Sequence, residues 1–60
     1  MLEREVLLEF MRIGNAVKVT AVDPVTLTEV SIQGPATSTE AALTRAAVAK
    51  LAYVLRRRAE

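Results

Sequence analysis

The 60-residue sequence contains no cysteine and no histidine. Without cysteine the chain has no disulfide framework and no thiolate nucleophile, and without histidine it lacks the imidazole base and the ordinary zinc ligands. Most hydrolytic and redox reactions therefore lose the side chains that usually carry them. We expect a protein that is not an enzyme and that holds no cofactor and no metal.

Aromatic residues and long apolar runs are also scarce. Phe10 and Tyr53 are the only aromatics, so the core must be aliphatic. No apolar run approaches the ~20 residues that span a bilayer, and Glu3, Arg4 and Glu5 interrupt any signal-like segment. A chain this short buries only about 60% of the surface that its unfolded form exposes. We expect one cytoplasmic domain, 1–60, of marginal stability and without membrane contact.

Alternating residues predict the first two strands. Residues 5–13 show the period-2 pattern of a half-buried strand, and Gly14-Asn15 then supplies a two-residue turn. Glycine at the first loop position favours a type II′ hairpin because it tolerates positive φ. Residues 16–23 are the predicted second strand. Pairing the residues of the two strands one by one outward from the turn places Phe10 opposite Val19 and keeps the apolar side chains on one face.

A second turn leads into the third strand. Asp23-Pro24 is typical of a turn, because proline fixes φ and aspartate bonds to the backbone ahead of it. If residues 24–27 form the loop, Asp23 faces the first residue of a third strand, residues 28–33. Leu27 would then adopt a left-handed conformation, which a residue with a Cβ adopts only at some cost. Gly34-Pro35 is expected to stop this strand.

Residues 38–58 predict one long amphipathic helix. Thr37 is expected to be its N-cap and Glu40 to complete a capping box. The bases of the last turn suit the negative end of the helix dipole. One arc at helical spacing is apolar and is expected to be buried; it consists of Leu43, Ala47, Val48, Leu51, Val54 and Leu55.

These elements give an α+β domain: a three-stranded antiparallel meander (β-β-β) covered on one face by a single C-terminal helix. We expect the apolar face of the meander to receive the helix, with Phe10 buried. This face consists of Val6, Leu8, Phe10, Val17, Val19, Ala21, Val30 and Ile32.

Two segments carry a resemblance to a known family, and they read EVLLEFMRIGNAVKVTAVDPVTLTEVSIQGP and AVAKLAYVLRRR. A strand with EF and GN-VKV, a DP-x-T turn, TEVSI-x-GP and a helix with KL-YVL are the pattern of a family of small, uncharacterised bacterial proteins. Our chain resembles this family over residues 5–57. The resemblance implies the same β-β-β-α order and carries over no activity and no catalytic residue. Glycine is usual in the family at the turn position that Leu27 occupies.

The three strands and a helix with AAVAKLAYVL also resemble the C-terminal part of a double-stranded-RNA-binding domain. Such domains contact phosphates through a lysine cluster at the start of that helix. The corresponding positions here contain no base, and they are Ser38, Thr39, Glu40, Ala41 and Ala42. We therefore do not expect RNA binding in this mode.

Three features of the sequence are not explained by the predicted fold of the monomer. The first strand has an open edge, the outer sheet face keeps apolar residues, and the helix has a second stripe of small residues with Tyr53 at its end. Alanine in that stripe is also explained simply by its helix propensity. We expect a homodimer, formed by the sheet or by the helix, and an unknown protein partner remains open. The candidate surface is Leu7, Met11, Val22, Ala42, Ala46, Ala49 and Tyr53.

Charged residues suggest a weaker alternative. A basic group on the helix could bind an anion, although a solvated helix end explains it more simply; it consists of Arg45, Lys50, Arg56, Arg57 and Arg58. Glu5, Glu9 and Glu29 on the outer sheet face could act as acid and base or bind a cation, but no nucleophile accompanies them. We expect a non-enzymatic interaction or structural module working as a homodimer. The alternative is a nucleic-acid accessory protein, but the lack of stacking aromatics predicts no specific binding.

Overall fold

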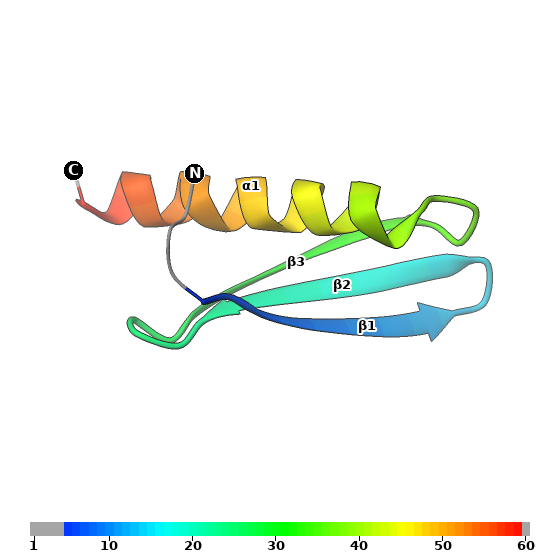
Figure 1. Cartoon of the computed structure of the whole chain (residues 1–60), viewed down its shortest axis with the longest axis horizontal. Helices are drawn as coiled ribbons and strands as arrows, with labels where there is room; N and C mark the ends of the chain where they lie inside the picture. The colour runs from blue at the N-terminus through cyan, green and yellow to red at the C-terminus, as the bar shows by residue number, and fades with distance from the viewer. Residues whose placement is uncertain (1–4, 60) are drawn as a thin grey trace.

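The computed structural model describes residues 5–59 and has the predicted α+β architecture. The elements follow in the order β1 (Leu7–Ile13), β2 (Ala16–Asp23), β3 (Thr28–Pro35) and α1 (Glu40–Ala59). The strands form one antiparallel sheet in sequence order, and α1 runs along one face of it (Figure 1). The β-β-β-α fold expected from the sequence is therefore confirmed.

Both predicted strand registers are confirmed. Phe10 lies opposite Val19, and Asp23 lies opposite Thr28. Gly14 has a φ of 59°, and Leu27 is the one non-glycine residue with positive φ within residues 5–59. A positive φ at the first loop position alone is the geometry of a type II′ turn. The two turns thus place Phe10, Val19 and Ile32 side by side on one face of the sheet.

Leu27 adopts the left-handed conformation that the loop count predicted. Its φ is 62°, and its backbone N–H donates to the carbonyl of Asp23 at 2.7 Å. The side chain is 76% exposed, so packing does not compensate for the conformation. The β2–β3 loop therefore holds a residue whose Cβ disfavours the backbone it adopts.

Replacing Leu27 by glycine is expected to raise the free energy of unfolding by about 0.5–1 kcal/mol. Glycine removes the steric strain of the left-handed conformation, and this gain exceeds the cost of the greater entropy of glycine in the unfolded chain. Leu27→Ala keeps the Cβ and is the matched control, which should remain close to the natural protein. Urea denaturation measures both. A glycine variant less stable than the alanine variant would contradict the argument.

The start of α1 differs from the prediction. The N-cap is Thr39 and not Thr37, because the hydroxyl of Thr39 accepts the backbone N–H of Ala42 at 3.1 Å. The N–H of Ser38 donates to the carbonyl of Pro35 at 2.9 Å, and this turn uses residues 36–38 before the helix can begin. Glu40 is consequently the first helical residue and forms no capping box, although it still suits the positive end of the helix dipole.

The core lies between α1 and the two strands nearest to it. The buried residues are Val19, Ala21, Val30, Leu43, Ala47 and Leu51, with Val6, Val17, Ile32, Val54 and Leu55 partly buried around them. Val48, at the margin of the predicted helix arc, is half-buried. The predicted helix arc is therefore the one that packs on the sheet.

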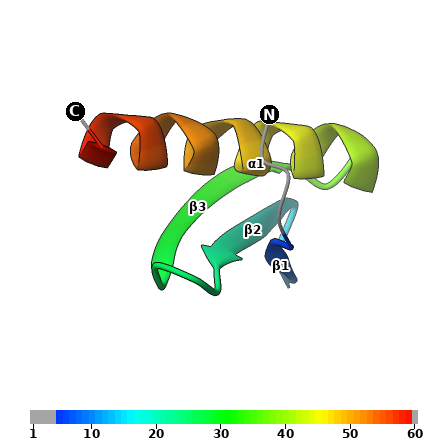
Figure 2. The same ribbon diagram turned by 60° about the vertical axis from the view of Figure 1, so that its left-hand side comes forward.

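The position of β1 corrects the predicted core. Phe10 was expected to be buried, but it is 36% exposed and Leu8 is 38% exposed. A helix ~10 Å wide covers about two strands spaced ~4.8 Å apart, and α1 covers β2 and β3. Figure 2 shows β1 on the side of the sheet away from β3 and α1. The helix therefore leaves β1 largely uncovered.

The element ends also differ by a few residues. β1 begins at Leu7 where residue 5 was expected, and α1 extends to Ala59 where residue 58 was expected. β3 runs through Gly34 to Pro35, which pairs with Ala16, where the prediction stopped at residue 33. A proline is tolerated at a strand position whose backbone nitrogen faces outward from the sheet.

Candidate functional site

The seven residues of β1 form the most distinctive surface of the described chain, and we call Leu7–Ile13 the β1 surface. All seven residues are exposed. Strand alternation places Leu8 and Phe10 on the face that carries α1, and three further apolar residues on the opposite face. The large apolar members are Leu7, Leu8, Phe10, Met11 and Ile13. Apolar side chains thus flank one strand on both faces.

The backbone of β1 adds unpaired groups at its outer edge. The carbonyl of Ser31 faces away from β2, since it accepts a hydrogen bond from Lys50 at 2.8 Å. Backbone groups alternate in direction along a ladder, so Thr20, opposite Ser31, directs its groups toward β1, where it pairs with Glu9. The residues on either side of Glu9 therefore point their N–H and C=O groups outward.

The outward-pointing residues of β1 are Leu8, Phe10 and Arg12. Within residues 5–59, no backbone N–H or C=O group of these three makes a hydrogen bond across the free edge. The edge also has no proline and no bulge, which are two of the usual means of preventing further strand addition. β1 therefore offers an intact template for another strand.

The outer edge of β3 is different because other parts of the chain already contact it. Lys50 of α1 donates to the carbonyl of Ser31, and Pro35 has no N–H to offer. The carbonyl of Pro35 accepts the N–H of Ser38 at 2.9 Å. Of the two sheet edges, β1 is consequently the less obstructed one.

The structure separates the predicted partner surface into two parts. Leu7 and Met11 are each 51% exposed, and Val22 is half-buried opposite Leu7. The helix stripe lies on α1 away from the sheet, with Tyr53 54% exposed; its other members are Ala42, which is half-buried, and Ala46 and Ala49, which are exposed. The sheet part and the helix stripe are not brought together.

Three exposed apolar residues of the β1 surface were not included in the predicted partner surface. Leu8 and Phe10 were assigned to the core, and Ile13, 50% exposed, was assigned only to the hairpin register. Their exposure follows from the width of one helix over three strands. The sequence predicts three strands and one helix, and a comparison of their widths could have identified these residues as exposed.

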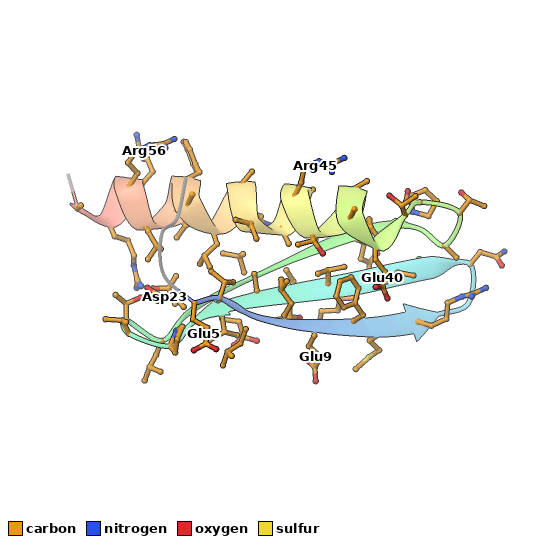
Figure 3. All side chains as sticks on the ribbon, in the orientation of Figure 1. Glu5, Glu9, Asp23, Glu40, Arg45 and Arg56 are labelled. Atoms are coloured by element: carbon orange, nitrogen blue, oxygen red, sulfur yellow. The ribbon has the colours of Figure 1, made fainter. Side chains whose placement is uncertain are left out.

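The predicted basic group does not form one patch. Lys50 bonds to Ser31, and Arg58 donates from Nη1 to the Thr28 hydroxyl at 2.7 Å. Figure 3 shows Arg45 and Arg56 projecting from the side of α1 that faces away from the sheet. Arg57 also lies in the last turn of α1. Two of the bases are therefore used to hold the helix against β3.

The acidic residues form no metal site among residues 5–59, where no group of three or more acidic side chains could hold an ion. Glu5, which precedes β1, and Glu9 of β1 project on the side opposite α1 (Figure 3). Within the same described range, no helix combines the length and the apolar character needed to cross a membrane.

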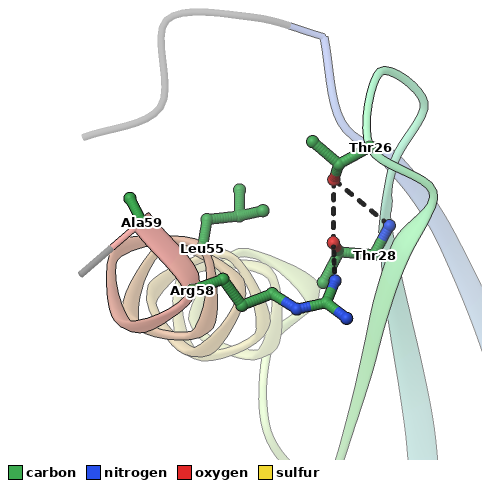
Figure 4. Close-up of a pocket in the computed structure, with 5 residues that line it drawn as sticks. All are labelled: Thr26, Thr28, Leu55, Arg58 and Ala59. Carbon is green, nitrogen blue, oxygen red and sulfur yellow. Dashed lines mark hydrogen bonds between the residues drawn. The ribbon is translucent and has the colours of Figure 1, made fainter.

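Grooves beside the sheet are found among residues 5–59. The first lies at the end of α1 (Figure 4), and its lining is Thr26, Thr28, Leu55, Arg58 and Ala59. The Thr26 and Thr28 hydroxyls bond to each other at 2.8 Å, and the Thr28 hydroxyl also accepts from Arg58, which connects the sheet to the helix at this groove. The second groove lies beside the β1 surface and is lined by Phe10, Arg12, Val17, Ala36, Ser38, Glu40 and Leu43.

Comparison with known protein families gives a match of unknown function. The model of a family described as a domain of unknown function (DUF6898) matches residues 3–58. No curated protein and no solved structure matches the chain. The expected resemblance to a small family without assigned activity is confirmed over nearly the whole sequence.

Proposed function

The chain belongs to the DUF6898 family, a domain of unknown function, and we propose that it is a non-enzymatic interaction module that works as a homodimer through the β1 surface. One observation supports this proposal above the others: β1 is exposed over its whole length and carries five large apolar side chains. Soluble monomers rarely leave a long apolar edge strand uncovered, because such an edge recruits other chains. Association would cover it.

The chemistry of the grooves supports a non-enzymatic role. The Thr26 hydroxyl donates to the Asp23 carboxylate at 2.8 Å and bonds to the Thr28 hydroxyl, which accepts from Arg58, so both hydroxyls are engaged in contacts that hold the β2–β3 loop and α1 together. The chain contains no cysteine or histidine to supply a nucleophile or a base elsewhere. Binding is therefore the activity that the described surface supports best.

Nucleic-acid association has less support. Lys50 and Arg58 make contacts within the chain, which leaves a dispersed charge on α1. Tyr53 is the one aromatic residue on the helix, and single-strand binding relies on stacked aromatics together with a basic groove. No feature of the described surface favours this alternative over protein association.

The homodimer predicts a specific molecular mass. Sedimentation equilibrium at tens of micromolar should give twice the 6.5 kDa of the monomer. Leu7→Lys should shift the equilibrium toward monomer, because it places a charge on the exposed apolar face of β1. A strictly monomeric natural protein at millimolar concentration would exclude the proposed function.

Ala49→Glu is the matched control for this experiment. Ala49 is exposed on the helix stripe, and glutamate favours helix nearly as well as alanine. This variant should keep the mass of the dimer if β1 is the interface. Dissociation by Ala49→Glu with no effect of Leu7→Lys would assign the dimer to the helix stripe instead.

A further inference from the structure

We propose that the strand which completes the open edge of β1 is β1 of a second copy, paired antiparallel so that Phe10 lies opposite its own counterpart. This inference rests on the proposed homodimer and adds the edge, the direction and the register. The edge of β1 is chosen because Lys50 already bonds to the Ser31 carbonyl on the edge of β3, Pro35 of that edge has no N–H, and the outward groups of β1 meet no other part of residues 5–59.

Symmetry limits the possible registers. Two residues directly opposite each other in an antiparallel pair either both point their backbone groups toward the partner strand or both point them away. In a symmetric dimer, the two-fold axis must therefore pass between one residue and the same residue of the other copy. Phe10 is the middle residue of Leu7–Ile13. Centring the pair on Phe10 matches the whole strand and uses all the outward groups, which gives about six new hydrogen bonds. Centring it on Glu9 or Met11 leaves two strand residues unmatched in each copy.

Charge favours the same centre. A pair centred on Glu9 would place two carboxylates directly opposite each other, and a pair centred on Arg12 would do the same with two guanidinium groups. Centred on Phe10, Glu9 faces Met11 and Arg12 faces Leu8 of the other copy, so no like charges meet. The remaining pairs are Phe10 with Phe10 and Leu7 with Ile13, and apolar cross-strand pairs stabilise a sheet.

The resulting dimer joins two three-stranded sheets into one sheet of six strands, with both helices on the same face. The groove beside β1 then becomes a shared site. Arg12 and Phe10 line this groove, and Leu8 of the second copy would lie beside Arg12. The second copy thus contributes an apolar side chain to a groove that one chain leaves incomplete.

Cysteine cross-linking tests the register, because the natural chain has no cysteine. An equimolar mixture of Glu9→Cys and Met11→Cys proteins should form disulfide-linked heterodimers on mild oxidation, since residues facing each other here have Cα atoms ~4.5 Å apart. Each variant alone should cross-link poorly, because the identical residues of the two copies would be roughly 8 Å apart, beyond disulfide reach. Both variants keep Phe10.

Leu27→Cys, which is exposed but distant in sequence from β1, measures cross-linking by random collision. The mixture should react roughly tenfold faster than this control or more, because residues within one dimer meet at an effective concentration near millimolar. Rapid cross-linking of Met11→Cys alone, or of Glu9→Cys alone, would overturn the Phe10 register. A dimer by mass that cross-links no faster than the control would refute pairing through β1 and leave the homodimer itself standing.

Discussion

Replacing Leu51 by alanine should lower the free energy of unfolding by about 2–5 kcal/mol. Leu51 is fully buried in the middle of α1 and is the largest fully buried side chain of the described chain. It packs in the single cluster between α1 and the sheet, where the neighbours are held by the strand pairing and cannot collapse into the cavity. The expected loss is comparable to the whole stability of a domain this small, about 3–9 kcal/mol.

Thermal and urea unfolding would measure this loss. Arg45→Ala is the control, because Arg45 is exposed on the same helix and alanine favours helix at least as well as arginine. Leu51→Met keeps nearly the same volume and should lose less than about 1.5 kcal/mol. Coincident unfolding curves for Leu51→Ala and Arg45→Ala would show that the orientation assigned to α1 is wrong.

Replacing Asp23 by alanine is expected to lower the free energy of unfolding by about 1.5–3 kcal/mol, because hydrogen bonds to a buried charged group contribute more than neutral ones. Asp23 is fully buried at the end of β2. Its carboxylate accepts the Val25 N–H at 3.2 Å and the Thr26 hydroxyl at 2.8 Å. These bonds shape the loop that holds Leu27 in its left-handed conformation.

Urea denaturation again provides the measurement, and two variants define the cause. Glu29→Ala removes a carboxylate from an exposed position in the adjacent strand and should have little effect. Asp23→Asn keeps an acceptor for the loop donors and should lose less than Asp23→Ala. Equal stability of Asp23→Ala and Glu29→Ala would mean that the carboxylate does not organise the loop.

Most of the sheet could be predicted from the sequence because its determinants are local. Gly14-Asn15 specifies a two-residue turn, and the turn together with the alternation fixes the pairing of Phe10 with Val19. The left-handed conformation of Leu27 followed from counting residues in one loop. In a meander each strand pairs with its neighbour in sequence, so short-range patterns carry nearly all of the topology.

The start of α1 and the exposure of β1 could not be obtained in this way. Thr37, Ser38 and Thr39 are all good N-cap residues, and the choice of Thr39 depends on the turn in which Ser38 bonds to Pro35. Alternation assigns Phe10 to the helix face of the sheet, but it does not say how many strands one helix covers. The candidate site consequently included Leu7 and Met11 and omitted Phe10.

The bond between Lys50 and the carbonyl of Ser31 has a consequence for the size of the proposed assembly. Pairing of β1 with β1 is isologous, so it consumes the same surface in both copies and closes after one step. Pairing of β1 with β3 would be head-to-tail and would continue from copy to copy into a filament, as unprotected sheet edges do. Lys50 occupies the Ser31 carbonyl and Pro35 has no N–H, so the edge of β3 offers fewer backbone groups for such growth than the edge of β1. The contact that holds the helix to the sheet would therefore also favour a closed dimer over a filament.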